Sequence, residues 1–120
     1  MYNVVTIGDK QVPMLAMASV DLYYRTIFKE DPIKLQSTGN PDDGDLINFV
    51  MRMGFVMAKF AELRDRKKMT ALTEDNFLEW LDQFEREDYL NALVDVRLTY
   101  EGQSVMTSDA KKKENAPTEQ

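Results

Sequence analysis

The stretch LINFVMRMGFVMAKFAEL, residues 46–63, decides the fold of this chain. Its apolar side chains recur at intervals of three or four residues, which is the spacing of one face of an α-helix. The pattern predicts a central helix of about five turns. Its buried stripe would contain Leu46, Phe49, Val50, Met53, Met57, Phe60 and Ala61.

On the N-terminal side of this stretch, residues 2–15 contain two β-prone runs around a short turn at Gly8. This arrangement predicts a β-hairpin. Pro13 has no backbone N–H to donate, so its strand is expected at a sheet edge.

Further helices are predicted on both sides of the central one. A first helix should begin after Ser19, a typical N-cap, and end near Lys29 because proline follows at position 32. The turn formers of residues 36–45 predict a loop. A third helix, capped by Thr70 or Thr73, and a fourth, from about residue 87 to 100, complete the set. The expected buried residues of these two helices are Phe77, Leu78, Trp80, Leu81, Phe84, Leu90, Leu93, Val94, Val96 or Arg97, and Leu98, with Gly102 ending the fourth helix.

The predicted fold is therefore mainly α: an N-terminal β-hairpin followed by a compact bundle of about four helices, in one domain of residues 1–103. Residues 104–120 are almost entirely polar and cannot bury enough apolar surface to offset the entropy of ordering. We expect them to form a polar, flexible, disordered C-terminal tail.

The composition argues against an enzyme. The chain has no cysteine and no histidine, which removes thiol nucleophiles, imidazole acid–base chemistry and the usual zinc sites. Gly8 is the only glycine near a predicted strand, so no nucleotide-binding loop can be assembled. Asp42, Asp43 and Asp45 lack the spacing of a calcium loop. We predict no catalytic residues, no metal, no cofactor and no small-molecule substrate.

The location expected from the sequence is the cytoplasm. The N-terminus lacks the basic and apolar regions of a signal peptide. Charged residues also interrupt the most apolar stretch, which is unlike a membrane span.

Charge is distributed unevenly along the chain. The net charge of -6 argues against a general nucleic-acid binder. Residues 74–95 hold eight carboxylates and one arginine, whereas residues 52–68 hold six basic and two acidic side chains. Either these segments attract each other within the fold, or they form a polar surface that steers a partner. The basic run of residues 64–68 is interpreted as a solvated helix end, with nucleic-acid contact as the alternative.

Aromatic side chains are the candidate partner-binding residues. Two clusters supply more aromatic surface than one helix face needs, and large aromatic side chains are the usual anchors of interfaces. Core packing accounts for most of them, and one member of each cluster is expected to remain for a partner. The candidates are Tyr23, Tyr24, Phe28, Phe77, Trp80 and Phe84. Self-association through the same apolar area is a further expectation.

Three segments carry a resemblance to a known family: Ile7-Gly-Asp-Lys, Tyr24-Arg-Thr-Ile-Phe28 and Phe77-Leu-Glu-Trp-Leu-Asp-Gln-Phe84. Over roughly residues 2 to 103 the chain resembles the tail assembly chaperones of long-tailed, siphovirus-like bacteriophages and prophages of Gram-positive bacteria. The resemblance implies a host-cytoplasmic protein that keeps the tape measure protein soluble, helps to recruit tail tube protein, and is absent from the mature virion. The alternative is a small phage-encoded DNA-binding or regulatory protein.

The resemblance also implies ribosomal frameshifting, because a longer form of such chaperones is commonly made in this way. Lys111, Lys112 and Lys113 mark a place where adenine-rich codons would allow slippage. A solubilising tail is the alternative reading of these lysines.

Overall fold

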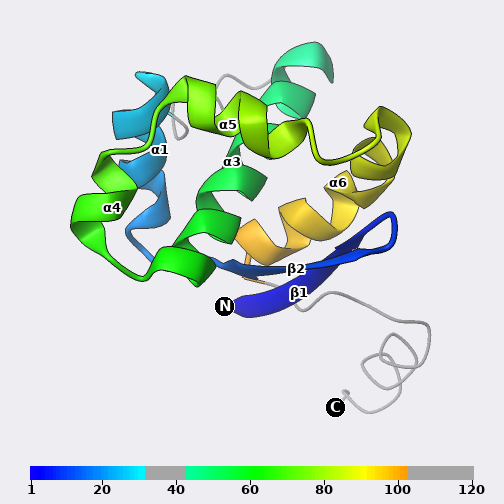
Figure 1. Ribbon diagram of the computed structural model, residues 1–120, viewed down its shortest axis with the longest axis horizontal. Coiled ribbons are helices and arrows are strands. Elements are labelled where there is room, and N and C mark those ends of the chain that lie inside the picture. The colour runs from blue at the N-terminus through cyan, green and yellow to red at the C-terminus, as the bar shows by residue number, and fades with distance from the viewer. Residues whose placement is uncertain (32–42, 103–120) are drawn as a thin grey trace, which may run out of the picture.

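The computed structural model describes residues 1–31 and 43–102. In this part, the chain forms an N-terminal antiparallel hairpin followed by five helices (Figure 1). The mainly helical class with one hairpin is therefore confirmed. The predicted tail, the tri-lysine run and most of the predicted loop lie outside the described residues.

The hairpin consists of β1 (Tyr2–Ile7) and β2 (Lys10–Leu15), joined by a two-residue turn. Gly8 has a φ of 64°, the left-handed conformation that such tight turns require and that glycine adopts without strain. Pro13 lies opposite Val4 in a sheet of only two described strands, so it stands at an edge as predicted. Alternate side chains point inward, and the buried ones include Val5, Ile7 and Met14.

The first described helix is α1 (Val20–Phe28), which ends within one residue of the prediction. Ser19 occupies the N-cap position, but its side chain makes no capping hydrogen bond, so that part of the prediction is wrong. Lys29 ends the helix in the left-handed conformation, with its N–H bonded to the carbonyl of Arg25.

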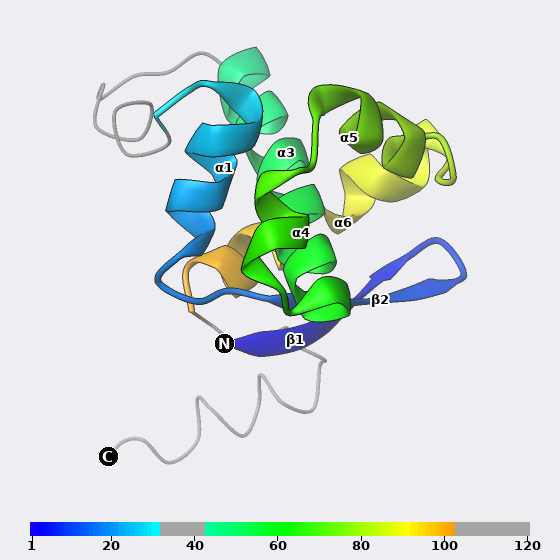
Figure 2. The same cartoon turned by 60° about the vertical axis from the view of Figure 1, so that its left-hand side comes forward.

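The centre of the molecule is α3 (Asp43–Leu63), which begins three residues before the predicted start. Figures 1 and 2 show it between α1 on one side and α6 on the other, with the hairpin across its C-terminal end. Because α3 packs against β2, α6 and α1, it buries more than one stripe of side chains. Phe55 and Val56, outside the predicted stripe, are fully buried.

The basic run of residues 64–68 follows the central helix and leads into a short helix of its own, in whose last turn Lys67 and Lys68 are exposed, as expected of a solvated helix end. The chain leaves α3 at Arg64, whose φ is 49°, and begins the short helix α4 (Arg66–Thr70). Asp65 starts α4 because its carboxylate accepts a hydrogen bond from the N–H of Lys68 at 3.0 Å.

Two helices complete the described chain: α5 (Glu74–Leu81) and α6 (Arg86–Tyr100). Thr73 caps α5 in a reciprocal capping box with Asn76, which confirms one of the two predicted caps. Gly102 follows α6 with a φ of 82°, and its N–H bonds to the carbonyl of Thr99. It ends the last helix as predicted.

The predicted buried faces of these helices need two corrections. Leu78 on α5 is 50% exposed, and Val94 on α6 is 69% exposed. Of the alternatives Val96 and Arg97, the structure buries Val96, whereas Leu90, Leu93 and Leu98 are only partly buried. The residues that α6 buries are Tyr89, Ala92, Val96 and Thr99.

Candidate protein-binding surface

Five of the six candidate aromatic residues form one network of ring contacts rather than two separate clusters, whereas Tyr23 contacts Phe60 outside that network. Phe28 from α1 meets Phe77 from α5 edge to face, with ring centroids 5.2 Å apart. Phe55 of α3 lies against both Phe77 and Trp80, at 5.5 and 5.6 Å. Edge-to-face geometry is the favourable arrangement for aromatic pairs. The network therefore fixes α1, α3 and α5 against one another.

Burial separates the six residues into two groups. Tyr24 and Phe77 are buried, and Trp80 is only 9% exposed. The half-buried members, which keep part of their surface toward solvent, are Tyr23, Phe28 and Phe84.

A polar network holds the first aromatic cluster in place. The hydroxyl of Tyr24 donates to Glu30 at 2.7 Å, and Arg52 donates to the same carboxylate oxygen at 3.1 Å. The Arg52 guanidinium also lies 5.2 Å from the ring centroid of Phe28 and 3.9 Å from Glu74. This last contact is the one ion pair among the described residues that joins the basic segment 52–68 to the acidic segment 74–95. Direct ion pairing between the two segments is therefore limited to Arg52 in the part of the chain that the structure describes.

The first of three surface grooves is lined by Phe84 and lies between the N-terminal half of α3 and the link from α5 to α6. Its volume is about 400 Å³. Phe84 is held from behind by Trp80, at a centroid distance of 5.0 Å, and by Tyr89, at 5.7 Å. We call this the Phe84 groove, and its other apolar lining residues are Ile47, Met51, Leu81, Tyr89 and Leu90.

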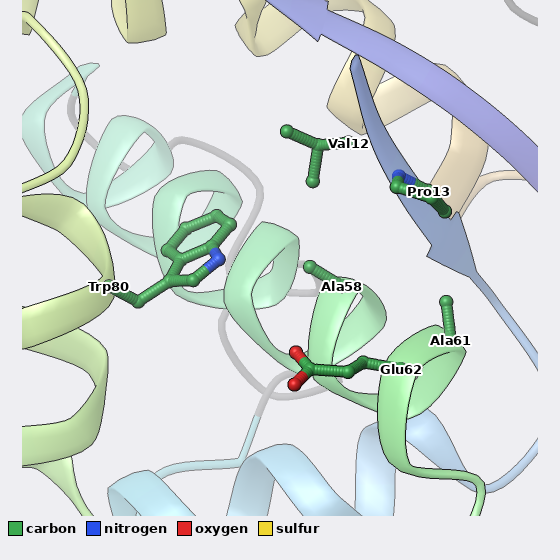
Figure 3. A pocket seen from close by; sticks show the side chains of 6 residues that line it. All are labelled: Val12, Pro13, Ala58, Ala61, Glu62 and Trp80. Atoms are coloured by element: carbon green, nitrogen blue, oxygen red, sulfur yellow. The ribbon is translucent and has the colours of Figure 1, made fainter. Parts of the chain in front are cut away.

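A second groove, of about 270 Å³, lies between the hairpin, α3 and α5 (Figure 3). The indole of Trp80 projects toward α3, and Val12 and Pro13 approach from β2. Small side chains on α3, Ala58 and Ala61, leave the space open. Glu62, which pairs with Lys59 at 3.4 Å, puts a charge at its border. We call this the Trp80 groove.

The third groove lies between α1 and α4 and has a volume of about 440 Å³. Its residues include Leu22 and Tyr23 from α1 and Arg66 from α4. The ring of Phe60 supports Tyr23 edge to face at 5.4 Å. We call this the α1–α4 groove.

The structure thus places three candidate residues, Tyr23, Trp80 and Phe84, each beside a groove. Tyr24, Phe28 and Phe77 line none of these three grooves, and their role in partner binding stays a prediction. Sequence reasoning missed Ile47 and Leu22, which are 38% and 56% exposed. Leucine on a helix is usually buried, so residue type gave no signal that Leu22 is exposed.

Other kinds of site find little support in the described residues. There is no group of three acidic side chains in residues 1–31 and 43–102 that could hold a metal ion. Asp42 and the side chain of Asp43 lie outside the described part. Among the helices that the structure describes, none has the length and apolar character needed to cross a bilayer.

Comparisons of this chain with protein-family models, with curated proteins and with solved structures find no match. The function is therefore inferred from the residues and their geometry.

Proposed function

We propose that this protein is a phage tail assembly chaperone that binds tape measure protein in the host cytoplasm. In this role it keeps its partner soluble, helps tail tube protein to assemble, and leaves before the virion is complete. The resemblance of the three sequence segments motivates the proposal. The observation that carries it is the Phe84 groove, an apolar recess on the surface of the described fold.

The Phe84 groove has the chemistry of a helix-binding site. An amphipathic helix presents apolar side chains at i, i+3, i+4 and i+7, and a groove of aromatic, leucine and methionine side chains can accept them. Met51 adds adaptability, because an unbranched thioether fits differently shaped neighbours. Asp82, Glu85 and Arg86 form a charged border that keeps the free protein hydrated.

The proposal is tested by expressing a tape measure protein alone, with the wild-type chaperone, and with an Ile47→Asp variant. Ile47 is 38% exposed, so the substitution adds a charge to the groove without opening the core. We expect the wild type to raise the soluble fraction of the partner severalfold and the variant to lose most of that effect. Met17→Asp is the matched control, because Met17 is 52% exposed and lines none of the three grooves.

Two results would contradict the proposal. One is a tape measure protein that stays insoluble with the wild type and does not bind it. The other is a salt-dependent shift of DNA by the purified protein, which favours the alternative of a regulatory DNA-binding protein. If Ile47→Asp and Met17→Asp lose the solubilising effect equally, the Phe84 groove is excluded as the binding site.

A further inference from the structure

The outer edge of β1 carries backbone groups that pair with nothing in the described part of the chain. The terminal nitrogen of Met1 donates to the carbonyl of Ala16 at 2.7 Å, and its carbonyl accepts from the N–H of Ala16 at 2.8 Å. Hydrogen-bonded pairs alternate along an antiparallel ladder, so every second residue of β1 directs its N–H and C=O away from β2. These residues are Tyr2, Val4 and Thr6, and no described residue bonds to their backbone.

The opposite edge of the hairpin is protected against a further strand. Along β2, the residues that face away from β1 are Gln11, Pro13 and Leu15. Pro13 stands in the middle of this edge without an N–H to donate, and α3 packs against the same strand. β1 has no such protection, and its outward residues Tyr2 and Val4 are 52% and 40% exposed. The open edge of the hairpin is therefore that of β1, and the ligand it fits is an extended strand.

Helix α6 brings the chain to this edge. It crosses the hairpin antiparallel to β1 (Figure 1). The first turn of α6 lies at the hairpin turn, where the Asp88 carboxylate is beside Gly8. Its last turn lies at the start of β1, where Nδ2 of Asn3 donates to Oγ1 of Thr99 at 3.2 Å. Gly102, whose N–H bonds to the carbonyl of Thr99, ends the helix there, so the next residues begin within reach of the open edge.

The sequence after Gly102 contains one segment with the composition of a strand. Residues 103–107 read Gln-Ser-Val-Met-Thr, in which valine and threonine favour extended backbone. Val105 and Met106 are the only large apolar residues in the sequence from 103 to 120. Extended, this segment spans about 13 Å, the same length as β1 from Tyr2 to Thr6. It therefore matches the open edge in length as well as in position.

We propose that residues 103–107 add a third strand to the open edge of β1, parallel to it. Because α6 crosses the hairpin antiparallel to β1, a chain that turns back at its end runs in the direction of β1. Parallel pairing then uses both backbone groups of Val4. Consecutive side chains of a strand point to opposite faces, so either Val105 or Met106 lies beside the exposed side chain of Val4.

The third strand has two consequences for the molecule. It closes the one edge of the described hairpin that could pair with an extended segment of another molecule. It also narrows the flexible tail expected from the sequence to residues 108–120, which leave the domain beside the hairpin turn at Gly8. Whatever follows residue 107 is therefore held at this end of the fold.

Amide hydrogen exchange of the full chain, followed residue by residue by NMR, tests the pairing. The Val4 amide should exchange slowly, although no described residue accepts its hydrogen bond. The double variant Val105→Pro, Met106→Pro removes two consecutive N–H groups, one of which must face β1. In this variant the exchange of Val4 should be faster by about tenfold or more. The Val5 amide bonds to β2 and should stay protected in both proteins, which shows that the hairpin is intact.

The matched control is the double variant Ala110→Pro, Lys111→Pro, which places the same substitutions after the proposed strand. Its Val4 amide should exchange like that of the wild type. Rapid exchange of Val4 in the wild type would show that the edge is open and would overturn the proposal. Equal exchange in the wild type and in Val105→Pro, Met106→Pro would overturn it too. Protection of Val4 that rises with protein concentration would assign the edge to a second copy instead.

Discussion

The hydroxyl of Tyr89 on α6 fills the space beside Gly54 of α3 that a side chain at this position would need. The same hydroxyl donates a 2.7 Å hydrogen bond to the carbonyl of Met51, one turn earlier on α3. Gly54 therefore has a packing role in the middle of a helix, where glycine is otherwise unfavourable by about 1 kcal/mol relative to alanine. A β-carbon at this position would occupy the place of the Tyr89 hydroxyl, and Val96 would also be in close contact.

We predict that Gly54→Ala destabilises the protein although it improves helix propensity. The added methyl group must push Tyr89 away, which breaks its hydrogen bond inside the core and strains the packing of α6. We expect the free energy of unfolding to fall by about 2 kcal/mol, measured by urea denaturation.

The partner variant Tyr89→Phe checks this explanation. Removing the hydroxyl makes room for the methyl group, so the double variant should lose clearly less than the two single variants together. Additive losses would show that the Gly54 effect does not pass through Tyr89.

A second prediction compares two glycines with similar backbones. Gly8 and Gly102 have φ angles of 64° and 82°, so alanine is strained at either position. A β-carbon at Gly8 would in addition approach the carboxylate of Asp88 to 2.5 Å, whereas nothing lies within 4 Å at Gly102. Gly8→Ala should therefore cost more stability than Gly102→Ala, by about 1 kcal/mol.

Thermal unfolding of the two glycine variants measures this difference. Adding Asp88→Ala to Gly8→Ala should remove most of the extra cost, because the remaining strain is then that of the backbone alone. Equal losses in both single variants would contradict the predicted contact with Asp88.

The elements of the fold that could be predicted are those with a local cause. The turn at Gly8, the cap at Thr73 and the end at Gly102 each follow from residues close in sequence. The break at Arg64 was missed because helix periodicity continues through it, and only the geometry of Asp65 shows that a new helix begins.

The candidate site was less predictable because burial depends on contacts between distant segments. Residue type alone suggests that Leu78 and Val94 are buried and that Tyr24 is available to a partner. In the fold, Tyr24 is enclosed by Phe28 and Phe49, while Leu78 faces outward. Which face of a helix is buried depends on the elements that pack against it. In α6 the neighbouring elements bury Tyr89, Ala92, Val96 and Thr99 and leave Val94 exposed.

A third prediction concerns alkaline pH. Burial raises the pKa of Tyr89, and burial with a contribution from Glu30 raises the pKa of Tyr24, both from a usual value of 10.0. Above about pH 10 the unfolded chain loses these protons while the folded chain keeps them, so the unfolded state binds fewer protons. Stability is therefore fully present below that pH and falls as pH rises, by about 1.4 kcal/mol per pH unit for each tyrosine.

Urea denaturation between about pH 9 and pH 11.5 measures this slope. Tyr89→Phe has no phenol to ionise, so its stability should fall less steeply with pH than that of the wild type. Parallel curves for the two proteins would contradict the assignment of the slope to Tyr89.

The last prediction uses Trp80 to report on binding in the Phe84 groove. It is the single tryptophan of the chain, and its indole lines the Trp80 groove and contacts Phe84 at a ring distance of 5.0 Å. A helix bound in the Phe84 groove would press on Phe84 and change the surroundings of the indole, so tape measure protein, or a tryptophan-free helical segment of it, should shift the emission of Trp80. Titration of the partner into Met17→Asp should therefore give the full emission change, because Met17 lines none of the three grooves, whereas Ile47→Asp should give little. An emission change in Ile47→Asp as large as that of the wild type would contradict binding in the Phe84 groove.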